Sequence, residues 1–319
     1  MPHDADIRNA LSTVNTSFNT IGEDIYSKAM PGAYSAYTEV IPANGLSTYR
    51  IDFGGATPIM RKWQGGKILK QFRVYTHSLT HEPYEATMWI ERRDLQYDGG
   101  AQVVSKKIGQ FLQNAAVGSY DKFCFAALVA NSTGYDGVSL FHASHPHGYT
   151  TNSNTGTSSL TKANVDATML AMRSWKNEYN EPIGVKPTIC LCGPANESKA
   201  KEIFETGDRI VTTDHKGAEV TEYGISSSTK QNIYQGTLKV IVDDRFVDGT
   251  RDYYWYLIDD STPLRPIIML EGAKPHPVKL DSENAEFRFW HDKYAYSVEG
   301  DFAAGPGFWW TAYRQAATA

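Results

Sequence analysis

Three histidines lie close together in the sequence and have the residue type that binds metal ions. His142, His145 and His147 fall within the segment Phe141-His-Ala-Ser-His-Pro-His-Gly148. Neutral imidazole is a good ligand for Zn²⁺ and Cu²⁺. No carboxylate or thiolate stands nearby in the sequence to complete a ligand set, and Pro146 stiffens the segment. The pattern therefore favours a structural turn without a metal, and a metal-dependent hydrolase built on the three histidines remains as an alternative.

Other catalytic residue types occur without the spacing that catalysis needs. The sequence contains no Gly-x-Ser-x-Gly, no Ser-x-x-Lys with its matching elements and no signature of a nucleophilic Cys. Cys190 and Cys192 lie on an expected buried strand, where a thiol is usually inert. The pairs Asp243-Asp244 and Asp259-Asp260 have the residue type for glycoside hydrolysis, but each closes an expected strand beside turn residues, where Asp is common for backbone reasons. We therefore expect no catalytic residue.

Nucleotide and cofactor signatures are also missing. No Gly-x-Gly-x-x-Gly follows a strand and opens a helix, and no Gly-Lys-Ser/Thr is present. The glycine-rich stretch 300–307 contains Pro306, which removes an amide that a phosphate cradle would need. We expect no cofactor and no enzymatic activity.

Charge and composition exclude further classes of protein. The chain has 319 residues, and 31 Lys and Arg against 36 Asp and Glu give a net charge of −5, which implies no bulk attraction to nucleic acid. The longest apolar run, Phe123 to Ala130, is far shorter than the roughly 20 residues that cross a bilayer. Three cysteines form no disulfide framework, and the first residues do not form a secretory signal. We expect a chain that stays where it is made and has no membrane partner.

Aromatic residues make up 12% of the chain, which favours wet protein contacts or sugar binding over a purely aliphatic core. A group near the end of the chain has the residue types that stack on sugars or bases. A buried or intersubunit cluster is the favoured interpretation of this group, which consists of Phe302, Phe308, Trp309, Trp310 and Tyr313.

A basic hairpin is expected early in the chain. Residues Leu46 to Met88 alternate polar and apolar types around the pairs Gly54-Gly55 and Gly65-Gly66, which indicates a long hairpin. Its tip carries five basic residues and no acid, namely Arg61, Lys62, Lys67, Lys70 and Arg73. Because a two-stranded ribbon poor in aliphatic residues cannot fold by itself, we expect it to project and to contact a partner.

The rest of the chain predicts an α+β fold. Residues 1–47 resemble an arm with one helix-like stretch, Asp4 to Ile21. A long helix is expected over about Gly100 to Asn131, bendable at Gly109 and Gly118, and a polar loop from Gly134 to Ser159 follows. Helices are then predicted at 162–179, capped by Thr161, and at 195–205, and strands at 188–192, 238–242, 253–258, 267–270 and 287–298. This order differs from an alternating βαβ array.

Three stretches in this order resemble the major capsid proteins of tailed phages with the Hong Kong 97 fold. Tyr75-Thr-His-Ser-Leu-Thr and Met88 to Asp98 are similar to the strand that leads into the long spine helix, and Gly100 to Asn131 is similar to that helix. Leu140-Phe-His-Ala-Ser-His-Pro146 resembles the Phe-x-x-x-His-Pro signature of Mu-like head subunits. Ala303-Ala-Gly-Pro-Gly-Phe-Trp-Trp310 is similar to the Gly-rich, Phe-Trp segment near the end of such chains.

The resemblance implies a division of the chain. It assigns an N-terminal arm to 1–47, an extended loop to 48–75, a peripheral domain to 76–159 and 276–319 with the spine helix at about 100–131, and an axial domain to 160–275. The implied function is that of a structural virion protein, made in the bacterial cytoplasm, that self-assembles as hexamers and pentamers into an icosahedral head around double-stranded DNA. Scaffold, portal and decoration proteins are the implied partners, and contact with DNA should be weak and non-specific.

The basic hairpin gives this implication a physical basis. The last 39 residues are rich in acids, so we expect the loop residues Arg61, Lys62, Lys67, Lys70 and Arg73 of one subunit to lie across the peripheral domain of its neighbour. Two further alternatives remain at this point. One is an encapsulin-type compartment, and the other is a carbohydrate-binding or tail-associated virion protein.

Overall fold

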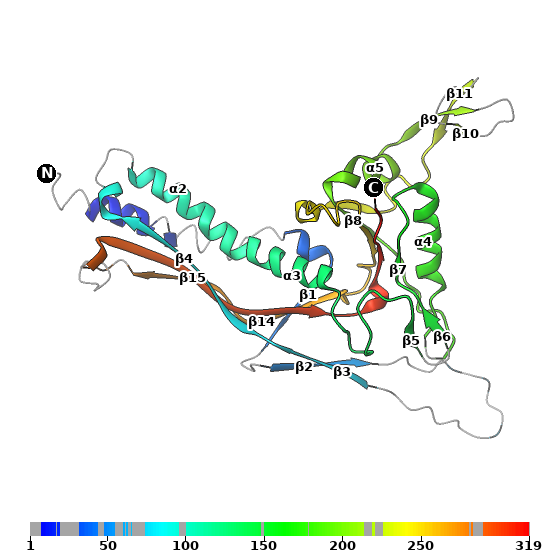
Figure 1. Cartoon of the computed structure of the whole chain (residues 1–319), viewed down its shortest axis with the longest axis horizontal. Helices are drawn as coiled ribbons and strands as arrows, with labels where there is room; N and C mark the ends of the chain where they lie inside the picture. Colours follow the sequence, from blue (N-terminus) through cyan, green and yellow to red (C-terminus); the bar gives the residue numbers. More distant parts are fainter. Residues whose placement is uncertain are drawn as a thin grey trace. The chain divides into compact units, whose positions relative to one another are not determined.

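Figure 1 shows a computed structural model of the chain. The structure describes residues 8–16, 18–19, 32–43, 48–54, 60, 62, 65, 74–95, 100–147, 150–177, 179–213, 219–220, 226–280, 282 and 290–318. Contacts between residues divide the chain into two units. Unit 1 comprises Met1–Ile51, His77–Ala130 and Ile267–Gly305, and unit 2 comprises Asp52–Thr76, Asn131–Pro266 and Pro306–Ala319.

Unit 1 contains a sheet that lies along a long helical segment (Figure 1). The strand order is β1-β14-β15-β4, with β1 at Thr38–Pro42, β14 at Ile267–Leu280, β15 at Lys293–Pro306 and β4 at Glu82–Glu91. β1 runs parallel to β14, and β15 runs antiparallel to β4. Alternate residues of β15 are buried, as expected for a sheet with one covered face.

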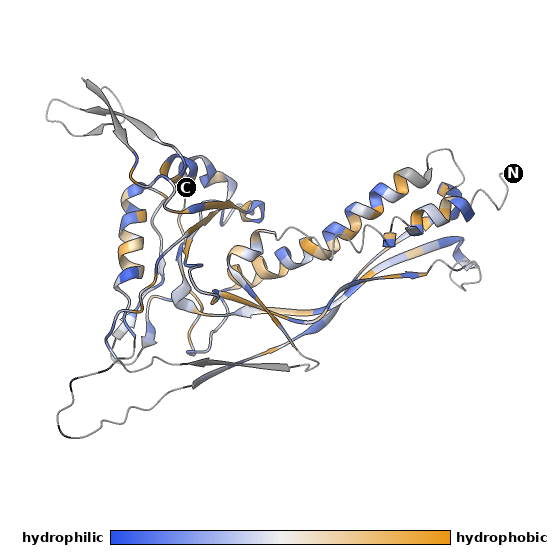
Figure 2. Cartoon of the chain, turned by 180° about the vertical axis from the view of Figure 1, so that it is seen from behind, coloured by the Kyte–Doolittle hydropathy of each residue, from blue (hydrophilic) through white to orange (hydrophobic). Residues whose placement is uncertain are grey.

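The helical segment of unit 1 runs from Gly100 to Ala130, which confirms the predicted long helix. It consists of α2 (Gly100–Gln113), a π-helical turn η3 (Asn114–Gly118) and α3 (Ser119–Ala130). The wide turn ends at Gly118, one of the two glycines expected to permit a bend. Figure 2 shows why the segment stays on the sheet: polar and apolar residues alternate along α2, and α3 is mostly apolar.

The core of unit 1 joins the sheet, α2 and the N-terminal helix. Residues 8–16 and 18–19 are helical, and the remainder of the predicted helix 4–21 lies outside the described residues. One buried cluster contains Leu11, Val14, Phe18, Ile90, Leu95, Val104, Ile108, Leu112, Ala115, Tyr294, Tyr296 and Val298. Short helical turns η1 (Ala33–Ala36) and η2 (Arg92–Leu95) complete this unit.

The turn η1 is attached to α3 through Asp121. The backbone N–H of Tyr34 donates to Asp121 Oδ1 at 2.9 Å, and Asp121 is buried. A Cβ atom at Gly32 would collide with the Asp121 carboxylate, so this close approach requires glycine.

Unit 2 is built around a second sheet, with the order β12-β8-β13-β16-β7. Its strands are β12 (Lys239–Val242), β8 (Ile189–Cys192), β13 (Trp255–Ile258), β16 (Ala312–Gln315) and β7 (Thr155–Gly156). The helices α4 (Lys162–Ser174) and α5 (Pro194–Phe204) and the turns η4 (Asp244–Phe246) and η5 (Trp309–Thr311) belong to the same unit. Smaller sheets pair β5 (His145–His147) with β6 (Thr150–Asn152), and β9 (Asp208–Thr213) with β10 (Glu219–Val220) and β11 (Ser226–Gln231).

Local sequence explains the central elements of unit 2. Every residue of β8 is buried, as the apolar run predicts. Thr161 caps α4 by accepting a hydrogen bond from the N–H of Asn164, and Pro194 opens α5 at its first position. A Cβ atom at Gly193 would lie 2.6 Å from Cβ of Phe246, so only glycine fits between β8 and α5.

Several sequence predictions need correction. The helix predicted at 162–179 ends at Ser174, because Trp175 adopts an extended backbone and its indole N–H donates to the carbonyl of Ser153 at 3.1 Å. The segment predicted as a polar loop, 134–159, contains the strands β5, β6 and β7. Polar residues of this segment make contacts inside the fold. The strand predicted at 287–298 corresponds to β15, which begins at Lys293, continues through the glycine-rich stretch to Pro306 and pairs with β4.

The predicted basic hairpin is shorter than the sequence indicates. β2 (Thr48–Gly54) pairs with β3 (Val74–Thr80), but β4, which the alternation predicts as part of the hairpin, joins the sheet of unit 1. The strand β14 extends to Leu280 instead of ending at Leu270, and residues 287–289 of the predicted strand 287–298 lie outside the described residues. Across the described ranges, none of the helices has the length and apolar character of a membrane span.

Candidate functional site

The two candidate histidines whose side chains the structure describes, His142 and His145, belong to no metal site. His145 begins β5 and is fully buried, whereas His142 is partly exposed and its ring centroid lies 6.1 Å from that of His145. The side chain of His147 is outside the described residues. Among the side chains that the structure describes, no group of three His, Cys, Asp or Glu residues has the arrangement of a metal site.

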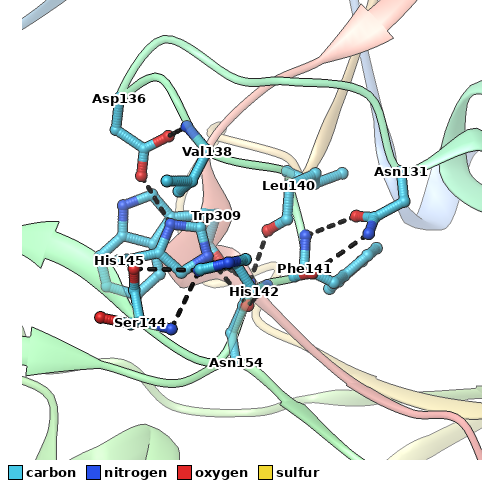
Figure 3. A network of polar contacts seen from close by, with 10 residues as sticks. All are labelled: Asn131, Asp136, Val138, Leu140, Phe141, His142, Ser144, His145, Asn154 and Trp309. Atoms are coloured by element: carbon cyan, nitrogen blue, oxygen red, sulfur yellow. Dashed lines mark hydrogen bonds and ion pairs between the residues drawn. The ribbon is translucent and has the colours of Figure 1, made fainter.

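His145 is instead the centre of a buried polar network (Figure 3). Its Nδ1 lies 2.6 Å from Oδ2 of Asp136, and its Nε2 lies 3.0 Å from Oδ1 of Asn154. Asp136 comes from the turn after α3, and Asn154 lies between β6 and β7. The sequence analysis found no carboxylate near the histidines because Asp136 precedes them by several residues and the turn folds back.

The hydrogen bonds of Asn154 determine the role of the His145 ring. The amide Nδ2 donates to the carbonyls of Leu140 at 2.8 Å and Trp309 at 3.0 Å, and Oδ1 accepts from the N–H of His142 at 2.8 Å. Carbonyl groups can only accept and a backbone N–H can only donate, so these partners identify which terminal atom of Asn154 is nitrogen and which is oxygen. Nε2 of His145 must therefore donate a hydrogen bond to Oδ1 of Asn154. Nδ1 is hydrogen-bonded to the carboxyl group of Asp136, so neither ring nitrogen of His145 has a lone pair available for a metal. The network is a structural contact, and neither ring nitrogen faces a serine or cysteine nucleophile.

The aromatic residues near the chain end are divided between the two units. In unit 2 the ring of Trp309 stacks on His145 with centroids 4.3 Å apart and planes 7° apart, and Trp175 stacks on Tyr313 at 6.2 Å. Phe302 belongs to unit 1, where it stacks on Tyr84 at 4.6 Å. The single cluster predicted for these rings is therefore wrong, but the expectation of buried packing is confirmed for Phe302 and Trp309.

The other candidate catalytic groups have structural roles. Cys190 and Cys192 are fully buried on β8, and the hydrogen bond with Cys192 together with burial raises the pKa of the Cys190 thiol well above its usual value. Asp243 caps η4 by accepting from the N–H of Arg245 at 3.0 Å, and Asp259 accepts from the N–H groups of Ser261 and Lys186. These contacts confirm the interpretation of both aspartates as turn-forming residues.

The predicted contact residues fall between β2 and β3 in the sequence. Lys62 is described and exposed, and Met60 beside it is 99% exposed. Arg61, Lys67, Lys70 and Arg73 lie outside the described residues.

Sequence analysis missed a group of carboxylates in unit 1, which we call the acidic ladder. It consists of Glu82, Glu85, Glu299 and Asp301, which lie on four consecutive positions of the antiparallel pair β4–β15. Glu299 stands directly opposite Glu85, and Asp301 is opposite Pro83. The cue in the sequence is weak, because more than 200 residues separate the two strands and nothing local predicts that they pair.

A cavity of about 500 Å³ lies beside the acidic ladder within unit 1. Its walls include both Glu85 and Glu299, the rings of Tyr84, Phe123 and Phe302, and the side chain of Lys122. The residues of the π-helical turn contribute Ala115 to the lining. Because side chains alternate along a strand, Glu85 and Glu299 lie on the opposite face of the β4–β15 pair from Tyr84 and Phe302.

Comparison with known families decides what kind of protein this is. Residues 78–315 match the family model described as phage capsid protein. The chain belongs to the phage capsid protein family. This capsid protein is 24% identical over 292 residues to the Mu-like prophage FluMu major head subunit of Haemophilus influenzae, an alignment that covers 90% of this chain and 68% of that protein.

Solved structures show the same fold. The capsid protein matches the procapsid of bacteriophage JBD30 with a TM-score of 0.54 and 21% identity, over 97% of this chain and 75% of that one. It matches a chain of Mycobacterium phage Patience with a TM-score of 0.52 and 12% identity, over 97% and 88% of the two chains. The resemblance to Mu-like major capsid proteins and the mixed helix and strand content of a phage capsid fold are thus confirmed.

These matches establish the function as that of a phage major capsid subunit, with the virion capsid as its location. The family is one of structural proteins and not of enzymes. The comparisons do not favour the encapsulin-type compartment or the carbohydrate-binding or tail-associated protein.

Proposed function

We propose that the capsid protein assembles with itself, as hexamers and pentamers, into an icosahedral head that encloses double-stranded DNA. The observation that carries the proposal is the family match over residues 78–315, and the solved relatives named as a procapsid and a capsid support it. Assembly takes place in the cytoplasm of the bacterial host. The protein has no enzymatic activity, no cofactor and no bound metal in this role.

The proposal assigns a role to each part of the chain. Residues 1–47 form the N-terminal arm, 48–75 the extended loop, 76–159 and 276–319 the peripheral domain, and 160–275 the axial domain around the symmetry axes. The long helix α2–α3 and the long strand β15 of unit 1 support the peripheral assignment. The helices α4 and α5 of unit 2 fall in the axial range.

Partners other than the chain itself follow from the same proposal. Scaffold and portal proteins act during assembly, and decoration proteins bind the finished shell, as the resemblance to the capsid proteins of tailed phages implies. Packaged DNA is contacted weakly, because subunits with a net charge of −5 confine a polyanion without binding it tightly.

The extended loop, residues 48–75, makes the contact between subunits. Arg61, Lys62, Lys67, Lys70 and Arg73 of one copy lie on the peripheral domain of its neighbour. The exposure of Lys62 and the absence of any acid between residues 61 and 73 support this contact. Each ion pair is weak, but a closed shell repeats it at every equivalent interface.

Electron microscopy of the expressed chain tests the proposal. Wild-type protein should form closed icosahedral shells. The triple variant Lys62→Glu, Lys67→Glu, Lys70→Glu should yield a folded, soluble subunit without shells, because the loop would then repel an acidic neighbour. A matched variant with the three lysines changed to Arg keeps the charge and should still assemble. Intact shells from the triple Glu variant would refute the role of the loop.

A further inference from the structure

The cavity of about 500 Å³ in unit 1 has one wall on the helical segment and one on the sheet. Ala115, Ser119 and Phe123 line it from η3 and α3, at the four-residue spacing of one helix face. Phe302 of β15 also lines it, and its ring lies against that of Phe123 with the centroids 5.1 Å apart. The strand positions that face the cavity are therefore those on the same face as Phe302, namely Tyr84, Ala86, Val298 and Gly300.

Small residues leave this space open. The lining includes Ala86 and Gly300 on the strands and Ala115 and Ser119 on the helical segment, none of which has a side chain beyond the γ position. Protein interiors seldom contain voids much larger than a water molecule. A cavity of about 500 Å³ falls instead within the range of roughly 300–1,000 Å³ that holds small-molecule ligands. The π-helical turn η3 ends directly before Ser119, and such turns are frequent at functional sites.

Three aromatic rings form one part of the cavity wall. Tyr84 stacks on Phe302 with the centroids 4.6 Å apart, and the ring of Phe123 lies 4.4 Å from that of Tyr84. Tyr84 and Phe123 are partly exposed, so a ligand can reach this wall from solvent. Flat aromatic groups pack on such rings in offset-stacked or edge-to-face arrangements, which favours an aromatic ligand over an aliphatic one.

Lys122 brings a positive charge to the cavity. It is exposed and lines the cavity, and its Nζ lies over the ring of Phe123, 5.8 Å from the centroid. Within the described parts of the chain, no carboxylate forms an ion pair with Lys122. Glu85 and Glu299 also border the cavity, but their side chains project from the opposite face of the strand pair.

Glu82 lies on the same face of β4 as Tyr84 but does not line the cavity. It is opposite Phe302, at the end of the strand pair. Burial, and after it the charge of Glu82, raise the pKa of Tyr84. An anionic group in direct contact with Lys122 would accept a charge-assisted hydrogen bond, which outweighs repulsion from a carboxylate outside the cavity.

We propose that this cavity binds a small, flat aromatic molecule that carries an anionic group, with its rings on the wall formed by Tyr84, Phe123 and Phe302 and its anionic group at Lys122. The inference goes beyond the assembly of subunits and does not depend on it. Such a ligand contacts the helical segment and the strands β4 and β15 together, and therefore stabilises the folded chain by mass action.

A matched pair of fluorescent probes tests the inference on the purified full-length chain. Anilinonaphthalene sulfonate has an aromatic body and an anionic group, and phenylnaphthylamine has the same aromatic body without the charge. Fluorescence titration should show one site for each probe. The sulfonate should bind about five times more tightly, as expected for an accessible ion pair. Lys122→Gln should remove this difference and leave the binding of the neutral probe unchanged, whereas Lys106→Gln, at an exposed position of α2, should leave both unchanged.

Filling the cavity locates the site. Ser119→Leu on α3 and Ala86→Leu on β4, made separately, should each weaken the binding of both probes by about tenfold or more, because the added side chain occupies the space of the aromatic body. Ser297→Leu is the control, since it adds the same bulk to the opposite face of β15 and should leave binding unchanged. Circular dichroism and a cooperative denaturation transition identify the folded variants.

Three results would overturn the inference. They are no binding of the sulfonate by the folded wild type, binding by a folded cavity-filled variant that equals the wild type, and a sulfonate affinity that Lys122→Gln does not change. Because Lys122 is exposed, its substitution tests the site even if both filling variants fail to fold.

Discussion

The His145 network and the acidic ladder are both polar clusters, but the first is buried with its polar groups paired, and the second is exposed with like charges side by side. In unit 2, His145 is fully buried and both of its ring nitrogens are hydrogen-bonded within the same unit. In unit 1, Glu85 and Glu299 are exposed and face one another without a cation. A satisfied buried network specifies the fold of its own subunit, whereas exposed like charges opposite one another lower the stability of the strand pair that carries them.

The largest expected effect follows from removing the centre of the buried network. His145→Ala leaves Asp136 and Asn154 without their partner and should lower the free energy of unfolding of the unassembled subunit by about 2–6 kcal/mol, at about 1–3 kcal/mol for each buried polar group left unsatisfied. Chemical denaturation followed by tryptophan fluorescence measures this change, because Trp309 stacks on His145. His142→Ala is the control, since that ring is partly exposed, and an equal loss in both variants would contradict the role given to His145.

A smaller effect should follow from removing the charge and keeping the shape. Asp136→Asn preserves a hydrogen-bonding oxygen near Nδ1 of His145 but loses the carboxylate, which should cost about 1.5–3 kcal/mol. The same denaturation experiment measures it. If Asp136→Asn is as stable as the wild type, the contact is an ordinary neutral hydrogen bond and the contrast with the acidic ladder becomes weaker.

The acidic ladder should respond in the opposite direction. Glu85→Gln with Glu299→Gln relieves the cross-strand repulsion and should stabilise the unassembled subunit by about 0.2–1 kcal/mol. Chemical denaturation of the variant beside the wild type measures this change. A variant less stable than the wild type would contradict the repulsion between these two carboxylates.

The smallest expected effect concerns Tyr234 and Asp166 on the surface of unit 2. The hydrogen bond to Asp166 is the main cause that raises the pKa of Tyr234 from 10.0 to about 12. Because the pKa is higher in the folded chain than in the unfolded chain, the stabilisation is complete below pH 10 and is lost as the pH rises through about 12. Asp166→Asn should bring the pKa of Tyr234 back toward 10, as measured by tyrosinate absorbance with Tyr234→Phe as the reference.

Local patterns are sufficient to predict the elements whose apolar spacing is strong. The helix from Gly100 to Ala130 and the buried strand Ile189–Cys192 are predictable because each carries its own periodicity or apolar run. Thr161 is predictable as a helix cap for the same reason, since the capping hydrogen bond is made within one turn.

The remaining features depend on pairing between distant residues. The polar composition of 134–159 predicts a loop, but Asn154 and His145 are buried because each finds partners across the fold. The end of α4 is set by the contacts of Trp175 and not by the helical periodicity of the sequence. The acidic ladder exists only because β4 pairs with β15, and no local signal specifies that register.

The order of strands in unit 1 has a consequence for synthesis on the ribosome. β1 and β4 come from the first 91 residues, yet β1 pairs with β14 and β4 pairs with β15, which begin at Ile267 and Lys293. The nascent chain cannot complete this sheet until β15 has been made, whereas β8, β12 and β13 of unit 2 emerge earlier. A polypeptide that ends before Lys293 lacks β15, so β4 is left without its partner strand and β14 without its link to β4.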